Sequence, residues 1–329
     1  MKILILGGGH FAGPALVTAA LARGAEVTVL NRGESAAPPP GVEHLIADRT
    51  DPAAMRAAVR GRSWDLAVDT WSGAPRIAAD SASALTEAVG RFAYVSTSSV
   101  YVWGEHTDEH SPVVDADAEA DATEYPADKR GAELGILQSF PDALLVRPGV
   151  ILGPGEDVGR LPWWLTRIAA GGRFVAPGDP ARPLQFIDVR DLAEFTLHAL
   201  TTGLRGPYDV TAPPRSVTMG SFLADCIAVT GADATPVWIP EAALEAAGVQ
   251  PWIELPCWVP DTAEFAGFLE HDPAHATAAG LRTRPAAATI AATWDWLGRA
   301  GTPPQRPDRP PHGLPPGKER ALLAAATRE

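Results

Sequence analysis

The first 24 residues constrain the fold more than any other part of this 329-residue chain. Residues 2–6 read KILIL, a short apolar strand of the kind that is buried on both faces of a parallel sheet. Three glycines at 7–9 end this strand, and the apolar spacing over 10–23 predicts a helix. A glycine closes the helix, and a second strand is predicted over 26–30. This order predicts a βαβ unit that binds a dinucleotide.

The glycine turn fits two motif registers, and both stay open. Gly7, Gly9 and Ala12 fit G-x-G-x-x-A, whereas Gly7 and Gly13 fit the ends of G-x-x-G-x-x-G with His10 in the middle. In either register the backbone can approach a pyrophosphate, and the N–H groups at the helix start can bind it. His10 either donates a hydrogen bond to phosphate or points to solvent. The cofactor-binding residues predicted in this turn are Gly7, Gly9, His10, Phe11 and Gly13.

Strand and helix patterns alternate through the first half of the chain. Further strands are predicted over 42–47, 65–68, 92–96 and 143–146, and helices over 51–59, 74–89 and 125–140. This alternation predicts an α/β fold over residues 1–150: a doubly wound parallel sheet, the Rossmann architecture.

The alternation is lost after residue 150. Residues 151–183 and 211–300 are expected to form a smaller, mostly helical substrate lobe, while 184–210 return to the dinucleotide-binding domain. One of the short strands expected there covers 184–187. Proline dominates after residue 300, so 301–329 is predicted to be an extended tail with a short helix near its end.

Composition narrows the classes of function. The net charge of −13 argues against a nucleic-acid partner and against anionic membranes. Two cysteines that lie far apart in sequence, Cys226 and Cys257, indicate neither a disulfide framework nor a metal site, and no metal is expected. With no long apolar run and no secretion signal, we expect a soluble cytoplasmic protein that acts on a small molecule. A homodimer is left open.

Two motifs make this nucleotide-binding chain a candidate enzyme. Tyr125 and Lys129 form a Y-x-x-x-K pair at the start of a predicted helix, where residues four apart share a face. A lysine there lowers the pKa of the tyrosine, which can then transfer the proton that accompanies hydride transfer. The second motif, residues 95–101, places hydroxyl groups just past the fifth strand, at the sheet edge where open α/β sheets bind ligands.

In this order the glycine turn, the hydroxyl-rich strand end and Y-x-x-x-K resemble the extended short-chain dehydrogenase/reductases, the NAD-dependent epimerase/dehydratase group. Residues 145–155 look like that group's RPG-x-x-x-GPG segment. Residues 186–192 resemble its F-I-x-V-x-D segment, and 206–210 its later strand. The resemblance covers about residues 2–300 and implies the same fold with enzymatic activity.

The resemblance implies a role for several residues. Tyr125 would be the acid/base, Lys129 its partner and a ribose ligand, Thr97 the hydroxyl that orients the substrate, and Asp48 the adenine-binding aspartate. The chain departs from the pattern at His10, which replaces the central glycine as in atypical members, some of them noncatalytic. It departs again at residues 148–149, Pro-Gly, where sugar-nucleotide epimerases usually carry an asparagine.

The residues after the second strand bear on the cofactor. NAD enzymes place an acidic residue there for the ribose 2′-hydroxyl, whereas this chain has Asn31 and Arg32. A guanidinium can bind a 2′-phosphate, so NADP is favoured and NAD is the second candidate. Ten tryptophans suggest that several line an apolar pocket. The weaker predictions of substrate contacts are Ser98, Trp71, Trp163 and Arg182.

Together these features predict an NAD(P)-dependent oxidoreductase that transfers a hydride between nicotinamide and a carbonyl or secondary alcohol. One alternative is an epimerase or dehydratase, in which the bound cofactor is reduced only transiently. The other is a noncatalytic nucleotide-sensing or RNA-binding relative, against which the intact Tyr125–Lys129 pair counts.

Overall fold

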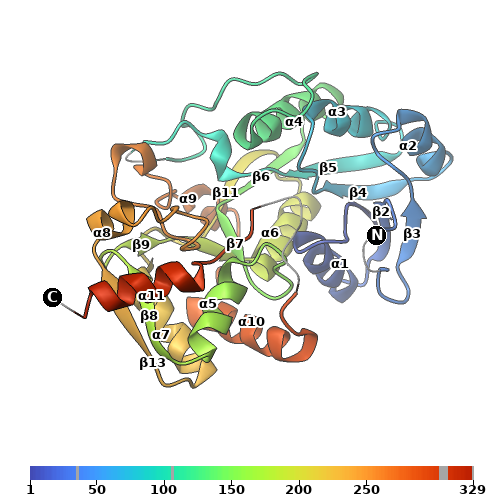
Figure 1. Cartoon of the computed structure of the whole chain (residues 1–329). Helices are drawn as coiled ribbons and strands as arrows, with labels where there is room; N and C mark the ends of the chain where they lie inside the picture. Colours follow the sequence, from blue (N-terminus) through green and yellow to red (C-terminus); the bar gives the residue numbers. More distant parts are fainter. Residues whose placement is uncertain (35–36, 105–106, 304–309, 328–329) are drawn as a thin grey trace.

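The centre of the molecule is a seven-stranded parallel sheet, seen in a computed structural model that describes residues 1–34, 37–104, 107–303 and 310–327 (Figure 1). Its strand order is β11-β6-β5-β4-β1-β2-β3. Every neighbouring pair runs parallel. The strands are β1 Lys2–Leu6, β2 Glu26–Asn31, β3 Glu43–Ile46, β4 Trp64–Asp69, β5 Val89–Val95, β6 Leu144–Pro148 and β11 Gly206–Val210. The predicted doubly wound fold is confirmed.

Helices cover both faces of this sheet because alternate strand residues point to opposite sides. Ile3 and Ile5 of β1 pack in one apolar cluster with residues of α1 and α6, whereas Leu4 and Leu6 pack in a second cluster with α2, α3 and α4. Figure 1 shows these two helical layers below and above the sheet. The helices are α1 Ala12–Ala22, α2 Pro52–Val59, α3 Pro75–Ser83, α4 Tyr125–Ser139 and α6 Val189–Thr202.

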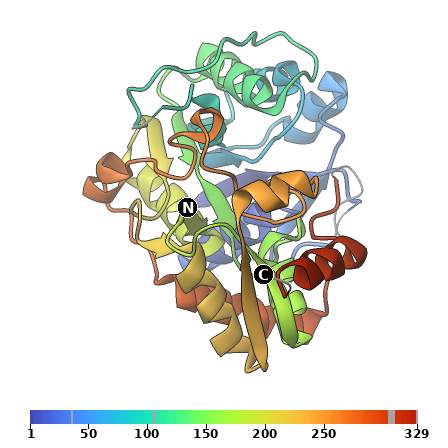
Figure 2. The same ribbon diagram turned by 60° about the vertical axis from the view of Figure 1, so that its left-hand side comes forward.

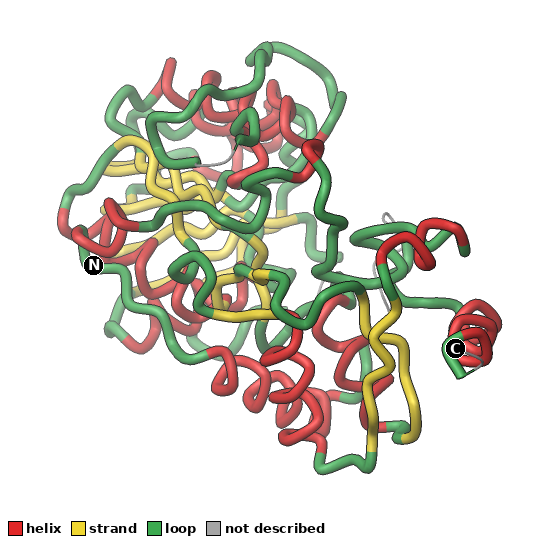
Figure 3. Tube along the Cα trace, turned by 90° about the vertical axis from the view of Figure 1, so that its left-hand side faces the viewer, coloured by secondary structure: helices red, strands yellow, loops and turns green. Residues whose placement is uncertain are grey.

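The second lobe combines helices with pairs of short strands. Its helices are α5 Arg160–Ala169, α7 Met219–Thr230, α8 Glu241–Ala246, α10 Ala286–Ala300 and α11 Pro316–Ala325. The short helix α9 Ala274–Ala278 is expected in this lobe from the sequence but packs against β11 of the central sheet. Its strands are β7 Val150–Leu152, β8 Gly172–Pro177, β9 Pro183–Leu184, β10 Phe186–Asp188, β12 Val217–Thr218 and β13 Ala234–Ile239. The parallel pair β8–β13 stands clear of the central sheet in Figure 3. The 3₁₀ turns are η1 Ser98–Val100 and η2 Ala263–Phe265.

Several elements differ from the expectation. The helix predicted over 74–89 ends at Ser83, because the chain then turns and Val89 enters the sheet opposite Trp64. The strand predicted over 184–187 is divided: Leu184 pairs with β12 and the next strand pairs with β7. β13 has no strand prediction, since its sequence ATPVWI contains a proline and its partner β8 lies far away in sequence.

The proline-rich end is more than an extended tail. Leu314 and Leu322 are buried in the apolar core of the second lobe. α11 packs beside β8 (Figure 2), and Glu319 accepts hydrogen bonds of 2.9 and 2.8 Å from Nε of Arg167. Part of the predicted tail, 304–309 and 328–329, lies outside the described residues. Among the described helices none is both long and apolar enough to cross a membrane.

Candidate active site

A cavity of about 1100 Å³ lies at the carboxyl ends of the central strands. The order of the sheet reverses between β1 and β4, and ligands of open α/β sheets bind at such a reversal. Sheet-side residues of the cavity come from the glycine turn and from the segments that follow β2, β3, β4 and β5, and α4 adds three more. The second lobe contributes the opposite wall, so one space connects both parts of the chain.

The glycine turn has the backbone that a tight phosphate-binding turn needs. Gly7 and Gly8 adopt φ values of 111° and 72°, which side-chain-bearing residues rarely adopt. A Cβ atom on Gly13 would lie 2.4 Å from Cα of Gly8, so only glycine allows the helix to approach the turn this closely. The close approach occurs at Gly13 and not at Ala12. This position matches the second register, G-x-x-G-x-x-G.

Phe11 shows backbone strain directly before α1. Its φ of 34° and ψ of −88° are unusual for a residue with a side chain, and such conformations cost about 1–3 kcal/mol. Phe11 also lines the cavity. The strain explains why the helix begins at Ala12 and not at the predicted residue 10.

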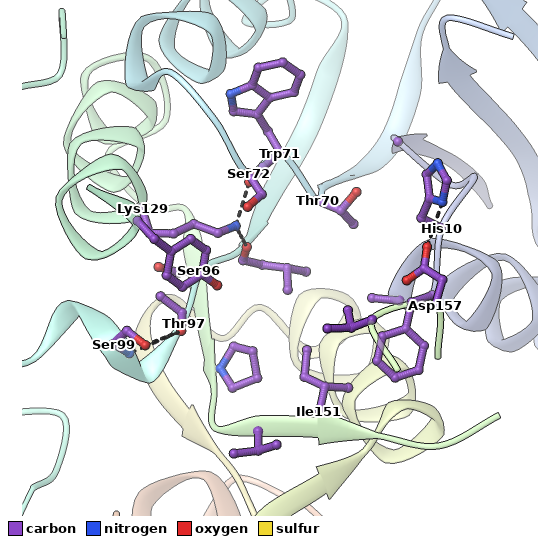
Figure 4. A pocket seen from close by; sticks show the side chains of 18 of the residues that line it. His10, Thr70, Trp71, Ser72, Ser96, Thr97, Ser99, Lys129, Ile151 and Asp157 are labelled. Atoms are coloured by element: carbon purple, nitrogen blue, oxygen red, sulfur yellow. Dashed lines mark hydrogen bonds and ion pairs between the residues drawn. The ribbon is translucent and has the colours of Figure 1, made fainter. Parts of the chain in front are cut away.

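His10 lines the cavity and contacts the segment that follows β7. Its side chain is 62% exposed, and Nδ1 lies 2.9 Å from Oδ2 of Asp157. Asp157 belongs to the segment between β7 and α5, so the contact connects the glycine turn to the second lobe (Figure 4). Neither of the two roles considered for His10 includes this hydrogen bond to Asp157.

Asn31 and Arg32 have different environments at the end of β2. Nδ2 of Asn31 donates a 3.0 Å hydrogen bond to the carbonyl oxygen of Gly7, which fixes the glycine turn against β2. Arg32 lines the cavity, is 62% exposed and forms a 3.1 Å ion pair with Glu34. Asp48 also lines the cavity; hydrogen bonds from the N–H and hydroxyl of Thr50 hold the pKa of its carboxyl below its usual value.

A buried ion pair behind this part of the cavity has no counterpart in the sequence predictions. Arg49 donates hydrogen bonds of 2.8 and 2.5 Å to the two carboxylate oxygens of Asp69, at the end of β4. Its guanidinium lies 5.0 Å from the ring centroid of Trp71. Arg49 and Trp71 both line the cavity. Two residues twenty positions apart show no periodic signal, so sequence reasoning could not pair them.

The three residues expected to carry the chemistry line the same cavity. Tyr125 begins α4 and is 44% exposed, and Lys129 lies one turn further along the helix. Nζ of Lys129 donates hydrogen bonds of 2.6 and 2.7 Å to the carbonyl oxygens of Trp71 and Val95 (Figure 4). Oγ1 of Thr97 accepts a 3.2 Å hydrogen bond from the N–H of Ser99. The strand ends after β4 and β5 therefore hold the lysine and the hydroxyl in place.

A buried ion pair fixes the helix that carries Tyr125. Arg147 of β6 donates hydrogen bonds of 2.8 and 2.7 Å to the two carboxylate oxygens of Glu133, further along α4. The guanidinium holds the pKa of Glu133 below its usual value although burial opposes this. α4 is thereby tied to the sheet beneath the cavity.

Of the four weaker predictions of substrate contacts, two lie in the cavity lining and two do not. Ser98 and Trp71 line the cavity, whereas Trp163 and Arg182 do not. Trp163 packs against its neighbour Trp164 on α5, with ring centroids 4.7 Å apart. Arg182 forms an ion pair of 2.5 Å with Asp261. Both lie in the predicted substrate lobe, but packing within that lobe turns them away from the cavity.

The comparisons place the chain in a family. The sequence pattern of the NAD dependent epimerase/dehydratase family matches residues 3–210, and the chain belongs to this family. The chain is 33% identical over 190 residues to 2′-dehydrokanamycin reductase of Streptomyces kanamyceticus, covering 55% of this chain and 53% of that protein, about half its length. It is 31% identical over 224 residues to 2-alkyl-3-oxoalkanoate reductase of Stenotrophomonas maltophilia strain K279a, covering 62% and 67%.

Solved structures show the same fold. WbmG of Bordetella bronchiseptica in complex with NAD superposes with a TM-score of 0.69 at 19% identity, covering 92% of this chain and 96% of that one. The Thermus thermophilus UDP-glucose 4-epimerase complex with NAD gives 0.64 at 21% identity, covering 91% and 100%. The predicted membership of the epimerase/dehydratase group is confirmed, and so is the fold class.

Proposed function

We propose that this protein is an NADP-dependent oxidoreductase that transfers a hydride between nicotinamide and a carbonyl or secondary alcohol of a small molecule. One observation carries the proposal: Tyr125, Lys129 and Thr97 line a single cavity together with the glycine turn. Both curated relatives are named as reductases, which supports reduction over epimerisation.

The residues of the cavity fit a nicotinamide dinucleotide. The close approach of Gly13 to Gly8 leaves the turn free of side chains where a pyrophosphate would lie, and the N–H groups at the start of α1 face the same turn. Asp48 and Arg32 would flank the adenosine end, and Lys129 the ribose next to the nicotinamide. When bound there, the nicotinamide supplies or accepts the hydride.

The chain itself provides the proton. The phenol of Tyr125 gives a proton to the substrate oxygen during reduction, or takes it during oxidation. The hydroxyl of Thr97 donates to the same substrate oxygen, and the backbone N–H of Ser99 fixes the position of Oγ1. Two donors on one oxygen stabilise the charge that develops there.

NADP is proposed over NAD because a cation occupies the end of β2. Arg32 lines the cavity there, and a guanidinium binds a 2′-phosphate better than a hydroxyl. Its present partner Glu34 also lines the cavity, so phosphate binding would replace this exposed ion pair. Exposed pairs contribute only about 0–1 kcal/mol, and the exchange costs little.

An epimerase remains the second candidate, because solved structures with this fold include UDP-glucose 4-epimerase. In that case the cofactor would stay bound and no net oxidation of NADPH would occur. The assay of the reductase proposal therefore follows the loss of NADPH absorbance with a panel of ketones and oxo acids.

The variant Tyr125→Phe tests the assigned role. We expect turnover to fall at least about 100-fold while NADPH binding is kept, because only the proton donor is removed. Tyr208→Phe is the matched control, since Tyr208 packs in the sheet core against Phe195 and lies outside the cavity lining. Equal turnover of wild type and Tyr125→Phe would refute the role of the tyrosine.

A further inference from the structure

The cavity has an aromatic wall, defined here as Trp103, Trp252, Phe265 and Phe268. The ring centroids of Trp103 and Phe268 lie 4.6 Å apart, and those of Trp252 and Phe268 lie 5.1 Å apart. These residues come from the segment after η1, the segment after α8, and η2 with its extension. Four aromatic rings from three segments form a surface suited to a hydrocarbon chain or an aryl ring.

One cation lies against this wall. Arg160, the first residue of α5, also lines the cavity, and its guanidinium carbon lies 5.5 Å from the ring centroid of Trp252. Its side chain is only 15% exposed, and within the described residues its Nε has no hydrogen-bond partner. The part of the guanidinium that remains accessible lines the cavity, where it is suited to bind an anionic acceptor.

The neighbouring carboxyl groups only partly neutralise the charge of this guanidinium. The oxygens of Glu156 accept hydrogen bonds of 2.9 and 3.2 Å from the backbone N–H groups of Arg160 and Leu161, and one of them lies 3.8 Å from the guanidinium. Burial raises the pKa of Glu156 to about 7, so at neutral pH its charge only partly balances that of Arg160. Asp157 is engaged by His10.

A second unused donor belongs to the aromatic wall. The indole nitrogen Nε1 of Trp103 is buried and has no hydrogen-bond partner within the described ranges. Tryptophan N–H groups usually find a partner when buried. A cation beside an aromatic wall suits a ligand that combines an acceptor with a hydrophobic body.

We propose that the substrate is an apolar carbonyl compound that carries a carboxylate, which Arg160 binds while the aromatic wall packs against the alkyl or aryl group. That the substrate is a carbonyl compound rests on the proposed reductase function. That it carries a carboxylate does not. A single guanidinium beside a carboxyl group suits a monoanion. A diphosphate would need more positive charge, and Arg182, another arginine of the second lobe, is held outside the cavity by Asp261.

The test measures binding without catalysis. Titration calorimetry on the full chain, saturated with NADP⁺, would use 4-phenylbutanoate and its uncharged amide as probes, with UDP as the diphosphate probe. We expect the carboxylate to bind at least about 10-fold more tightly than the amide, because hydrogen bonds to charged groups are the stronger ones. Equal affinities of acid and amide, or tighter binding of UDP, would overturn the proposal.

Variants separate the two halves of this site. Arg160→Gln should weaken the carboxylate about 10- to 100-fold and leave the amide unchanged, and Arg160→Lys should recover part of the loss. Phe268→Ala should weaken both probes alike. Arg182→Gln is the matched control and should change neither. Unchanged carboxylate binding in Arg160→Gln, with NADPH binding intact as proof of folding, would contradict the assignment.

The inference and the proposed function can fail separately. If the carboxylate binds through Arg160 but no ketone or oxo acid oxidises NADPH, the reductase proposal fails and the anion site stands. If carbonyl compounds are reduced without preference for acids over their amides, the reductase proposal stands and the anion site fails.

Discussion

Glu156 makes folding stability depend on pH in a direction opposite to that of most carboxyl groups. It is fully buried at the start of α5, and burial raises its pKa from the ordinary 4.5 to about 7. Between these two pH values the folded protein holds a proton that the unfolded chain has released. The stabilisation by this proton is fully present below pH 4.5 and is lost as the pH rises through 7.

The magnitude follows from the two pKa values. At about 1.4 kcal/mol for each tenfold change in proton affinity, the step from 4.5 to about 7 corresponds to about 3 kcal/mol. Glu156→Gln removes the titration, while Oε1 of glutamine can still accept from the N–H of Arg160. The free energy of unfolding of the variant, relative to wild type, should therefore rise by about 2.5 kcal/mol between about pH 5 and pH 8.

Urea denaturation followed by tryptophan fluorescence, at pH values from about 5 to 8, measures this difference. Asp209, whose pKa burial raises to about 8, is present in both proteins and cancels in the comparison. Glu245→Gln, an exposed glutamate of α8, is the control and should give a flat difference. Parallel pH profiles for wild type and Glu156→Gln would refute the reasoning.

Two further predictions concern the cofactor. Gly13→Ala places a Cβ atom 2.4 Å from Cα of Gly8 and should weaken NADPH binding at least about 10-fold, measured by nicotinamide fluorescence; Gly298→Ala, in open space within α10, should leave binding unchanged and stabilise by about 0.5–1 kcal/mol. Arg32→Ala should weaken NADPH about 10-fold and leave NADH nearly unaffected, because only the 2′-phosphate is lost as a partner. Equal losses for both nucleotides would show that Arg32 does not read the phosphate.

The parts of the fold that local patterns encode could be predicted from the sequence. The glycine turn between Leu6 and Ala12 and the alternation of strands and helices up to β6 are local, and so is the spacing of Tyr125 and Lys129 on one helix. Parallel strands end at one edge of the sheet, so the shared position of Thr97 with that pair could also be anticipated.

The remaining features depend on contacts between distant segments. The pair Arg49–Asp69 and the aromatic wall with Arg160 form only when separate loops meet, and no periodicity marks them. The break between β9 and β10 results from pairing with two different strands. Trp163 is predicted to contact the substrate but packs against Trp164 of its own helix. The sequence alone does not distinguish these two roles of an aromatic residue.

The most direct test of the account is a titration of the purified chain with NADPH and with NADH, followed by nicotinamide fluorescence. We predict saturable binding of NADPH at one site for each chain, tighter than the binding of NADH, and loss of NADPH binding in Gly13→Ala. Failure of both nucleotides to bind the folded wild-type chain would contradict the central claim that this cavity is a dinucleotide-dependent active site.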